Sequence, residues 1–331
     1  MTKPVAITMG CPVGIGPEII LRLFDELKGG DYYPPVVLGD LGVLARTADL
    51  LNSEVQPVSW QPGLDIQPGT VPVLELSNLD LGCLQWGSPT RETSIAMADY
   101  IRRAVQGALH DDFTAMVTCP ISKKSLNEAG IHYPGHTEML AELTGAADYR
   151  MMMAGNRLRV VLATIHEPLA RVSKLLTVDG IRDSIKMTVY SLQHDFGISR
   201  PRVAVAGLNP HSGEQGMFGN EELDIIAPVI HEYVGEGLIS GPWPPDTVYY
   251  KAAAGEFDAV VAMYHDQGLI PFKLLHFKDG VNVTLGLPIV RTSVDHGTAY
   301  DIAGQGRADA SSLKAAWIMA AEIADNRAEN L

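Results

Sequence analysis

The chain has few cysteines and no long apolar segment. Three cysteines occur among 331 residues, at positions 11, 83 and 119, and no two of them form a C-x-x-C pair. This rarity argues against a disulfide framework and against a cysteine zinc site, and it favours a reducing compartment. No uncharged segment approaches the roughly 20 apolar residues that span a bilayer, and the N-terminus does not have the pattern of a secretory signal. We therefore expect a cytoplasmic protein with no membrane partner.

Basic residues are scarce relative to acidic ones. The sequence has 25 Lys and Arg residues against 39 Asp and Glu residues, which gives a net charge of -14. Binding to a nucleic-acid backbone requires a basic face, so no nucleic-acid partner is expected. A small anionic ligand would need a local basic pocket, because the protein as a whole carries the same sign of charge.

Strand-like and helix-like segments alternate along the chain. This order is typical of an α/β protein with mostly parallel strands, and the length with 46% hydrophobic residues suffices for one large or two ordinary domains. Short apolar runs predict buried strands over 5–9, 35–38, 115–118, 158–164, 203–206 and 259–263. Helical periodicity predicts helices over 17–27, 93–109, 181–193 and 221–234.

Histidines mark the candidate site. His166, His211 and His265 each follow the carboxyl end of an apolar, strand-like run. Open α/β sheets bind ligands beyond the carboxyl ends of their strands, so these imidazoles could converge. Three neutral imidazoles with an open position suit a catalytic zinc or a similar divalent ion. A single strand-end histidine is more often a structural hydrogen bonder, and it is the joint position of three that favours a metal site.

Carboxylates lie close to two of these histidines. Glu214 follows His211 by three positions, and Asp266 directly follows His265. Either carboxylate could orient a metal-binding imidazole. Ordinary loop capping is the alternative role for the neighbouring polar residue Asn209.

Hydrogen-bond donors for an anion occur in two polar loops. Lys123 follows the strand expected at 115–118, and His136 and Thr137 lie in the next polar loop. Thr137 could equally belong to the start of a helix. Two further cations, Lys273 and Arg291, flank an apolar stretch that contains glycine, and they offer local positive charge in an acidic chain.

A glycine-rich turn over residues 10–18 follows the first expected strand and precedes a helix. Its spacing matches neither the dinucleotide pattern G-x-G-x-x-G nor the P-loop pattern. Pro17 is typical of the first turn of a helix. We interpret the segment as a tight structural turn that could contact an active site.

Six motifs taken together resemble one known family. The motifs are Gly10-Cys-Pro-Val-Gly-Ile-Gly-Pro-Glu18, Pro134-Gly-His-Thr-Glu138, Gly207-Leu-Asn-Pro-His-Ser-Gly-Glu214, Pro245-Asp-Thr247, Tyr264-His-Asp-Gln-Gly268 and Arg291-Thr-Ser-Val-Asp-His-Gly-Thr298. In this order, and over essentially the whole chain, they resemble the 4-hydroxythreonine-4-phosphate dehydrogenase family of vitamin B6 biosynthesis. That family includes relatives that act on 4-phospho-D-threonate or 4-phospho-D-erythronate.

The resemblance implies a fold similar to that of the isocitrate and isopropylmalate dehydrogenases, with two α/β subdomains around a central cleft. Residues 1–125 and 285–331 would form a discontinuous cofactor-side subdomain. Residues 126–284 would form a subdomain for metal binding, substrate binding and dimerisation. The protein would be a homodimer with an active site shared between its subunits.

The resemblance also implies roles for individual residues. His166, His211 and His265 would ligate the metal, with His265 entering the site of the partner subunit. The substrate and its phosphate would be held by His136, Thr137, Lys273, Asn282 and Arg291. The loop 295–306 is similar to the adenosine-binding loop of the isopropylmalate dehydrogenases, and its cofactor contacts would be Asp295, His296, Gly297, Ala299 and Asp301.

The reaction that the resemblance implies is oxidation of 4-hydroxythreonine 4-phosphate to a 3-keto acid, followed by decarboxylation to 3-amino-2-oxopropyl phosphate. The cofactors would be NAD or NADP and a divalent metal, zinc first, with magnesium, cobalt or manganese as alternatives. For the alcohol proton, Asp246 or Lys123 is the expected base.

Other functions remain open at the level of the sequence. A 4-phospho-D-threonate or 4-phospho-D-erythronate 3-dehydrogenase and a dihydrodiol dehydrogenase would carry nearly the same metal and cofactor motifs. A metal-dependent hydrolase could use the same three histidines, but it would have no need of the loop 295–306. A non-catalytic metabolite-binding protein would not need a metal site. The family usually has an acidic residue where this chain has Cys11, so the contact at that position is expected to differ.

Overall fold

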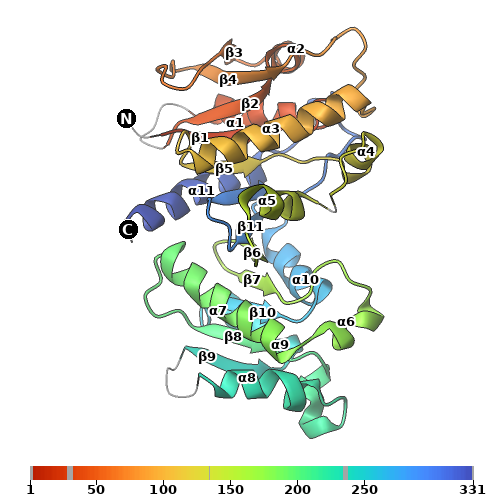
Figure 1. Ribbon diagram of the computed structural model, residues 1–331, viewed down its shortest axis with the longest axis vertical. Coiled ribbons are helices and arrows are strands. Elements are labelled where there is room, and N and C mark those ends of the chain that lie inside the picture. Colours follow the sequence, from red (N-terminus) through yellow and green to blue (C-terminus); the bar gives the residue numbers. More distant parts are fainter. Residues whose placement is uncertain (1–2, 28–32, 134, 234–237, 330–331) are drawn as a thin grey trace. The chain divides into compact units, whose positions relative to one another are not determined.

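The computed structural model describes residues 3–27, 33–133, 135–233 and 238–329 (Figure 1). By their internal contacts the residues form two compact units, 1–147 with 287–324 and 148–286 with 325–331. Each unit is a sheet with packed helices, which confirms the expected α/β class. Residues 126–147 contact helix α3 (Arg91–Leu109) of the first unit through α4 (Lys123–Glu128) and α5 (His136–Thr144). The division by contacts therefore falls after residue 147, whereas the expected boundary stood at residue 125.

The first unit contains a parallel sheet in the strand order β3-β4-β2-β1-β5-β12. Its central strands are buried on both faces, as is typical of parallel sheets covered by helices on both sides. The strands are β1 (Val5–Thr8), β2 (Pro35–Asp40), β3 (Gln56–Ser59), β4 (Thr70–Ser77), β5 (Ala115–Thr118) and β12 (Arg291–Val294). The helices are α1 (Gly16–Glu26), α2 (Leu41–Leu51), α3, α4, α5 and, through residue 324, α11 (Ser311–Glu329).

Local signals explain where several of these helices begin. Asp40 is the N-cap of α2, and its Oδ1 accepts a hydrogen bond from the Val43 amide at 2.9 Å. Thr90 caps α3 and forms a capping box with Thr93. Such caps each stabilise a helix by about 1 kcal/mol. In α1 the first turn contains Pro17, whose missing amide would have no helical partner there.

The second unit contains a mixed sheet in the order β11-β6-β7-β10-β8-β9. The pairs β11–β6 and β6–β7 are antiparallel, and the pairs along β7-β10-β8-β9 are parallel. Its strands are β6 (Arg150–Ala154), β7 (Arg159–Leu162), β8 (Val203–Ala206), β9 (Ile239–Trp243), β10 (Ala259–Ala262) and β11 (Val281–Leu285). Its helices are α6 (Leu169–Leu175), α7 (Val178–His194), η2 (Glu222–Ile226), α8 (Ala227–His231), α9 (Pro245–Ala253) and α10 (His265–His276), and a turn η1 spans Pro210–Gly216.

The core of the second unit lies between the sheet and helices α9 and α10. Phe272 of α10 is fully buried against residues of β7 and β10 such as Val160 and Val260. Gly268 lets α10 approach the sheet closely, because a Cβ there would lie 2.6 Å from Cγ1 of Val160. This packing fixes the start of α10, which carries His265, relative to the strand ends.

The expected helix over 221–234 takes a different form. Residues Glu222–Ile226 form a π-helix, followed by the α-helix Ala227–His231, and Val234 lies outside the described residues. Pro228 has no amide hydrogen to donate to the carbonyl four residues earlier, so a regular α-helical ladder cannot run through this segment. Among the described residues, no helix is long and apolar enough to cross a membrane.

Candidate metal and substrate site

The three strand-end histidines follow three adjacent strands of the second unit. His166 lies beyond β7, His211 lies in the turn after β8, and His265 is the first residue of α10 after β10. Strand β10 pairs in parallel with β7 on one side and with β8 on the other. The three imidazoles therefore belong to the same edge of the sheet, the edge at which α/β proteins bind ligands.

Two polar side chains tie these strand ends together. Gln267 accepts a hydrogen bond from the Met263 amide through Oε1 at 2.7 Å and donates one from Nε2 to the Gly207 carbonyl at 2.7 Å. The Thr164 hydroxyl donates to the Met263 carbonyl at 2.7 Å. Both side chains are buried, so their hydrogen bonds fix the ends of β7, β10 and β8 at one level.

One ring nitrogen of His265 contacts a carboxylate, as is common for histidines that bind a metal through the other ring nitrogen. Its Nδ1 lies 2.7 Å from Oδ1 of Asp266, which leaves Nε2 as the nitrogen that could bind an ion. The rings of His265 and His166 are 5.5 Å apart between centroids, with an interplanar angle of 41°. Of the two carboxylates considered in the sequence, Asp266 contacts the imidazole of its neighbouring histidine, whereas Glu214 has an exposed side chain.

His211 lies in a turn of left-handed backbone. The five residues from His211 to Gln215 all have positive φ, between 44° and 76°, and only Gly213 among them is a glycine. For a residue with a Cβ, this conformation costs roughly 1–2 kcal/mol of conformational free energy. Strained backbone of this kind is often found where a side chain is held for binding or catalysis.

Within one chain, and among its described residues, no group of three or more His, Cys, Asp or Glu side chains is placed to hold a metal ion. The paired imidazoles of His166 and His265 and the carboxylate on His265 nevertheless fit the nitrogen-rich donor set that zinc prefers. The residues present therefore fit a divalent ion with at least one ligand supplied from elsewhere.

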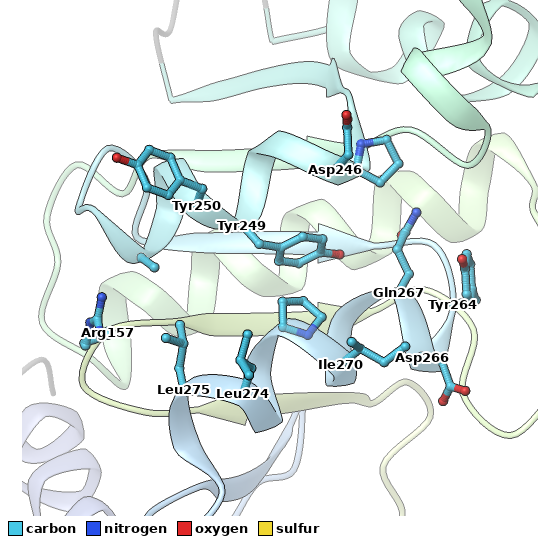
Figure 2. Close-up of a pocket in the computed structure, with 13 residues that line it drawn as sticks. Arg157, Asp246, Tyr249, Tyr250, Tyr264, Asp266, Gln267, Ile270, Leu274 and Leu275 are labelled. Carbon is cyan, nitrogen blue, oxygen red and sulfur yellow. The ribbon is translucent and has the colours of Figure 1, made fainter.

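A pocket of about 590 Å³ lies between α9 and α10, close to the start of α10. Figure 2 shows Asp246 at one end, with Tyr249 and Gln267 along the wall and Leu274 near the floor. Asp246, one of the two expected bases, is exposed in the first turn of α9. The hydroxyl of Tyr249 is buried and has no hydrogen-bond partner among the described residues. Burial raises the pKa of this phenol.

Several donors for an anion gather in the first unit at the start of α5. The N-cap of this nine-residue helix is Gly135, which has no side chain to accept hydrogen bonds from the first backbone amides of the helix. A Cβ at Gly135 would lie 3.3 Å from Nζ of Lys123, which places the other expected base beside this helix end. Helix N-termini with a nearby cation are favourable positions for phosphate groups. Pro134 of this motif lies outside the described residues.

Arg291 is buried beside this helix end. Its side chain is 2% exposed, and Nη2 donates to the Thr118 hydroxyl at 2.6 Å. Burial lowers the pKa of the guanidinium to about 9, and the carboxylate of Glu138 opposes that shift. A cation of this kind is costly to bury unless an anion completes its environment.

His136, the first residue of α5, is held neutral by the same surroundings. Burial lowers the pKa of the imidazole well below 6.5, and the positive charges of Arg291 and Lys123 lower it further. Its Nε2 is buried and has no hydrogen-bond partner among the described residues. Thr137 beside it is buried as well. These residues belong to the first unit, together with Arg291.

The other expected substrate residues belong to the second unit. Lys273 lies on α10, where Nζ is 5.9 Å from the centroid of the Phe277 ring. Asn282 lies on β11 opposite Met153, and its Oδ1 is buried with no partner among the described residues. An amide oxygen in that state is ready to accept a hydrogen bond from a ligand.

The expected cofactor loop is anchored on the N-terminal turn of the first unit. The Thr298 carbonyl accepts a hydrogen bond from the Ile15 amide at 3.1 Å, and the Gly304 amide donates to Oε1 of Glu18 at 2.6 Å. The Asp295 amide donates to the Ser312 hydroxyl at 3.1 Å. The turn over residues 10–18 therefore supports the loop, as its interpretation as a structural turn near an active site suggested.

Cys11 contacts this loop directly. The Tyr300 hydroxyl donates to Sγ of Cys11 at 3.3 Å. Cys11 is fully buried, and burial raises the pKa of its thiol. The sulfur of Cys11 is a weak acceptor, so this hydrogen bond is weaker than one to a carboxylate would be.

Sequence reasoning missed three supporting residues: Gln267, Glu18 and Glu222. Glu222 is 2% exposed and binds Asn209, next to the turn that carries His211. The spacing of Glu222, Ile226 and Val229 places all three on one helical face, and this pattern could have shown that Glu222 is buried.

The fold and these side chains define an α/β enzyme, and comparison with known proteins identifies it as a dehydrogenase. The chain belongs to the family described as pyridoxal phosphate biosynthetic protein PdxA, whose model matches residues 31–320.

Relatives and solved structures agree with this assignment. A protein from Desulfosudis oleivorans named 4-hydroxythreonine-4-phosphate dehydrogenase is 56% identical over 324 residues, 97% of this chain and 96% of the relative. The crystal structure of 4-hydroxythreonine-4-phosphate dehydrogenase from Klebsiella pneumoniae matches with a TM-score of 0.87 and 41% identity, covering 98% of each chain. A terephthalate 1,2-cis-dihydrodiol dehydrogenase from Burkholderia xenovorans matches less well, with a TM-score of 0.65 and 30% identity over 97% of this chain and 98% of that one.

Proposed function

We propose that this protein oxidises 4-hydroxythreonine 4-phosphate with a nicotinamide cofactor and a divalent metal, and that the resulting 3-keto acid loses CO2 to give 3-amino-2-oxopropyl phosphate. The observation that carries the proposal is the 56% identity, over nearly the full length, to a relative named for this substrate. The better match to the Klebsiella pneumoniae structure than to the dihydrodiol dehydrogenase favours a phosphorylated substrate.

In the first unit, the donors at the start of α5 would hold the substrate phosphate. Arg291 supplies a buried charge, and the uncapped helix amides lie in the same region as Lys123. His136 stays neutral and can offer a hydrogen bond through Nε2, while Thr137 offers its hydroxyl. In the second unit, Lys273 and Asn282 would contact the remaining polar groups of the substrate.

His166, His211 and His265 would hold the divalent ion, zinc first, with magnesium, cobalt or manganese as alternatives. When bound, such an ion lowers the pKa of a coordinated alcohol and stabilises negative charge on a neighbouring oxygen. Asp266 keeps the His265 ring oriented with Nε2 outward. The tethers from Gln267 and Thr164 keep the three strand ends in place while substrate binds.

The cofactor, NAD or NADP, would bind at the loop 295–306 through Asp295, His296, Gly297, Ala299 and Asp301. A Cβ at Gly297 would meet no atom within 4 Å, which leaves space for a ligand beside the backbone. The anchoring of Thr298 and Gly304 on the N-terminal turn supports a preformed site.

The base that removes the alcohol proton would be Asp246 or Lys123. Asp246 lines the pocket beside the start of α10, and Lys123 lies next to the start of α5. Neither side chain is buried, so both can reach a ligand. Replacing Asp246 by Asn and Lys123 by Met distinguishes them, because loss of the base removes the fall of kcat toward acidic pH while leaving cofactor binding intact.

The partner would be a second copy of this chain. Ile270, Leu274 and Phe277 lie on one face of α10 and are 68%, 85% and 79% exposed. Apolar residues gathered on one face are typical of a protein interface. The same helix begins with His265, so pairing about a twofold axis through this face would bring His265 toward the partner's metal site. The first unit would then serve as the cofactor side, and the second as the metal and dimerisation side, in a cytoplasmic homodimer.

The test measures reduction of the nicotinamide by its absorbance, in the presence of metal, for each member of a panel of phosphorylated substrates. Turnover of 4-hydroxythreonine 4-phosphate should exceed that of 4-phospho-D-threonate and 4-phospho-D-erythronate. Chelation should abolish the activity and divalent ions should restore it to different extents. Full turnover by metal-free protein, or a clear preference for a threonate, would reject the proposal, and hydrolysis without nicotinamide would favour a metal-dependent hydrolase.

A further inference from the structure

The turn that carries His211 is held by one buried carboxylate. Glu222 accepts the Asn209 amide through Oε1 at 2.7 Å and the Asn209 side-chain amide through Oε2 at 2.9 Å. The backbone amide and the side-chain amide of Asn209 thus both donate to Glu222, directly before the left-handed residues begin. This side chain fixes the entry of the turn.

The same carboxylate lies against the turn itself. A Cβ at Gly213 would lie 2.7 Å from Oε2 of Glu222, and a Cβ at Gly207 would lie 3.0 Å from Oε1. The chain therefore passes Glu222 on both sides of His211, with glycine where the carboxylate needs space. The preceding residue, Glu221, is partly exposed. Within the described part of the chain it accepts one hydrogen bond, from the Asn209 side chain at 2.8 Å.

Glu222 also begins the π-helix η2, in which Ile226 is fully buried. A π-helical segment is costly and is frequently found at functional sites. Here the widened turn lies at the position where the carboxylate reaches Asn209. Glu222 therefore belongs to the π-helical segment and also binds the residue that precedes the left-handed turn.

We propose that Glu222 is a positioning residue that holds the left-handed turn over residues 211–215 so that His211 presents its imidazole to the divalent metal. The inference rests on the proposed metal site. It assigns to Glu222 no contact with substrate, cofactor or ion. A buried, hydrogen-bonded carboxylate suits this role because it accepts two donors at fixed angles.

The test compares Glu222→Gln with Glu221→Gln in the full-length protein. The glutamine introduced by Glu222→Gln has nearly the same shape, but one acceptor becomes a donor that faces the donors of Asn209. In metal-free protein, the amides of Asn209, Ser212 and Phe218, which bond within this region, should exchange hydrogen about tenfold faster or more. Affinity for Co²⁺, measured by chelator competition and by its visible spectrum, should fall about 10- to 100-fold. Glu221→Gln should change both within about twofold.

A compensating variant restores the contact. In the triple variant Asn209→Asp with Glu221→Gln and Glu222→Gln, donor and acceptor are exchanged across both side-chain contacts of Asn209, so exchange and Co²⁺ affinity should return toward the wild-type values. If Glu222→Gln does not fold, Asn209→Ala removes the other side of the contact and takes its place in both measurements.

Unchanged exchange at these amides in Glu222→Gln would overturn the proposal, and so would faster exchange with unchanged Co²⁺ affinity. Failure of the triple variant to restore either quantity would overturn the pairing with Asn209. Failure of the proposed metal site is a separate result: wild-type protein would then bind Co²⁺ no better than His166→Ala.

Discussion

The imidazole rings of His166 and His265 lie 5.5 Å apart within one chain. Two imidazoles on one tetrahedral zinc have ring centres about 5 Å apart, for Zn–N bonds near 2 Å. The spacing therefore suits a single-chain pair, which competes with the shared site in which His265 enters the partner subunit. The two arrangements differ in what a mixture of inactive variants can do.

Mixing His166→Ala with His265→Ala should restore activity if the site is shared. One site of a mixed dimer then carries both lesions, and the other carries neither. With random exchange about half of the dimers are mixed, so roughly a quarter of all sites should recover. The measurement is turnover after subunit exchange, with mixed dimers verified by native mass spectrometry. Verified mixed dimers without activity would establish the single-chain pair.

Arg291→Ala should lower kcat/KM for the phosphorylated substrate by about tenfold or more, since a charge-assisted hydrogen bond contributes about 1.5 to 3 kcal/mol. The unphosphorylated alcohol serves as the matched control, because its turnover does not depend on phosphate binding. Arg291→Lys should recover part of the loss. Equal losses on both substrates would contradict a role in phosphate recognition and would indicate a structural role for the contact with Thr118.

Stability should fall as the pH drops below about 6.5 because of His136. Burial and the charges of Arg291 and Lys123 depress the pKa of this imidazole in the folded protein, so the unfolded chain binds its proton first as the pH falls. Folding therefore loses stability from the unfolded pKa downward, until the folded imidazole is protonated too. The unfolding midpoint should depend less on pH in His136→Gln than in the wild type. Parallel curves for the two proteins would contradict the neutral, buried state of His136.

Alkylation should distinguish the cysteines. Cys83 is exposed, whereas Cys11 and Cys119 are buried, and burial raises the pKa of both buried thiols. The hydrogen bond to Asp80 raises the pKa of the Cys83 thiol as well, so exposure to the reagent distinguishes the three sites. Iodoacetamide should therefore modify Cys83 in the folded protein and reach the other two only after unfolding. Peptide mass spectrometry reads the sites, and Cys83→Ser should remain unmodified. Alkylation of native Cys11 would show that its contact with Tyr300 opens to solvent.

Much of the framework could be predicted because its signals are local. The strands β5 and β8 have the expected bounds, and the apolar runs around β1, β7 and β10 differ from their strands by a few residues at most. The helix expected at 221–234 is present over 221–231, but residues 222–226 of it form a π-helix, since Pro228 has no amide hydrogen for a regular α-helical bond. Strands β3, β4, β6, β9, β11 and β12 were not expected, because strands of mixed composition depend on their neighbours in the sheet.

Local sequence signals were enough to predict the α/β class and the positions of His166, His211 and His265 at strand ends, since strand, turn and helix signals act between residues close in the chain. Tertiary structure alone decided that these strands are adjacent, that Gln267 ties β10 to β8, and that Glu222 and Arg291 are buried. The physical reason is that burial and hydrogen bonding depend on which distant segments pack together. From the sequence alone, a charged residue is expected to be exposed. Glu222 and Arg291 are buried because the folded chain supplies hydrogen-bond partners for them, Asn209 and Thr118.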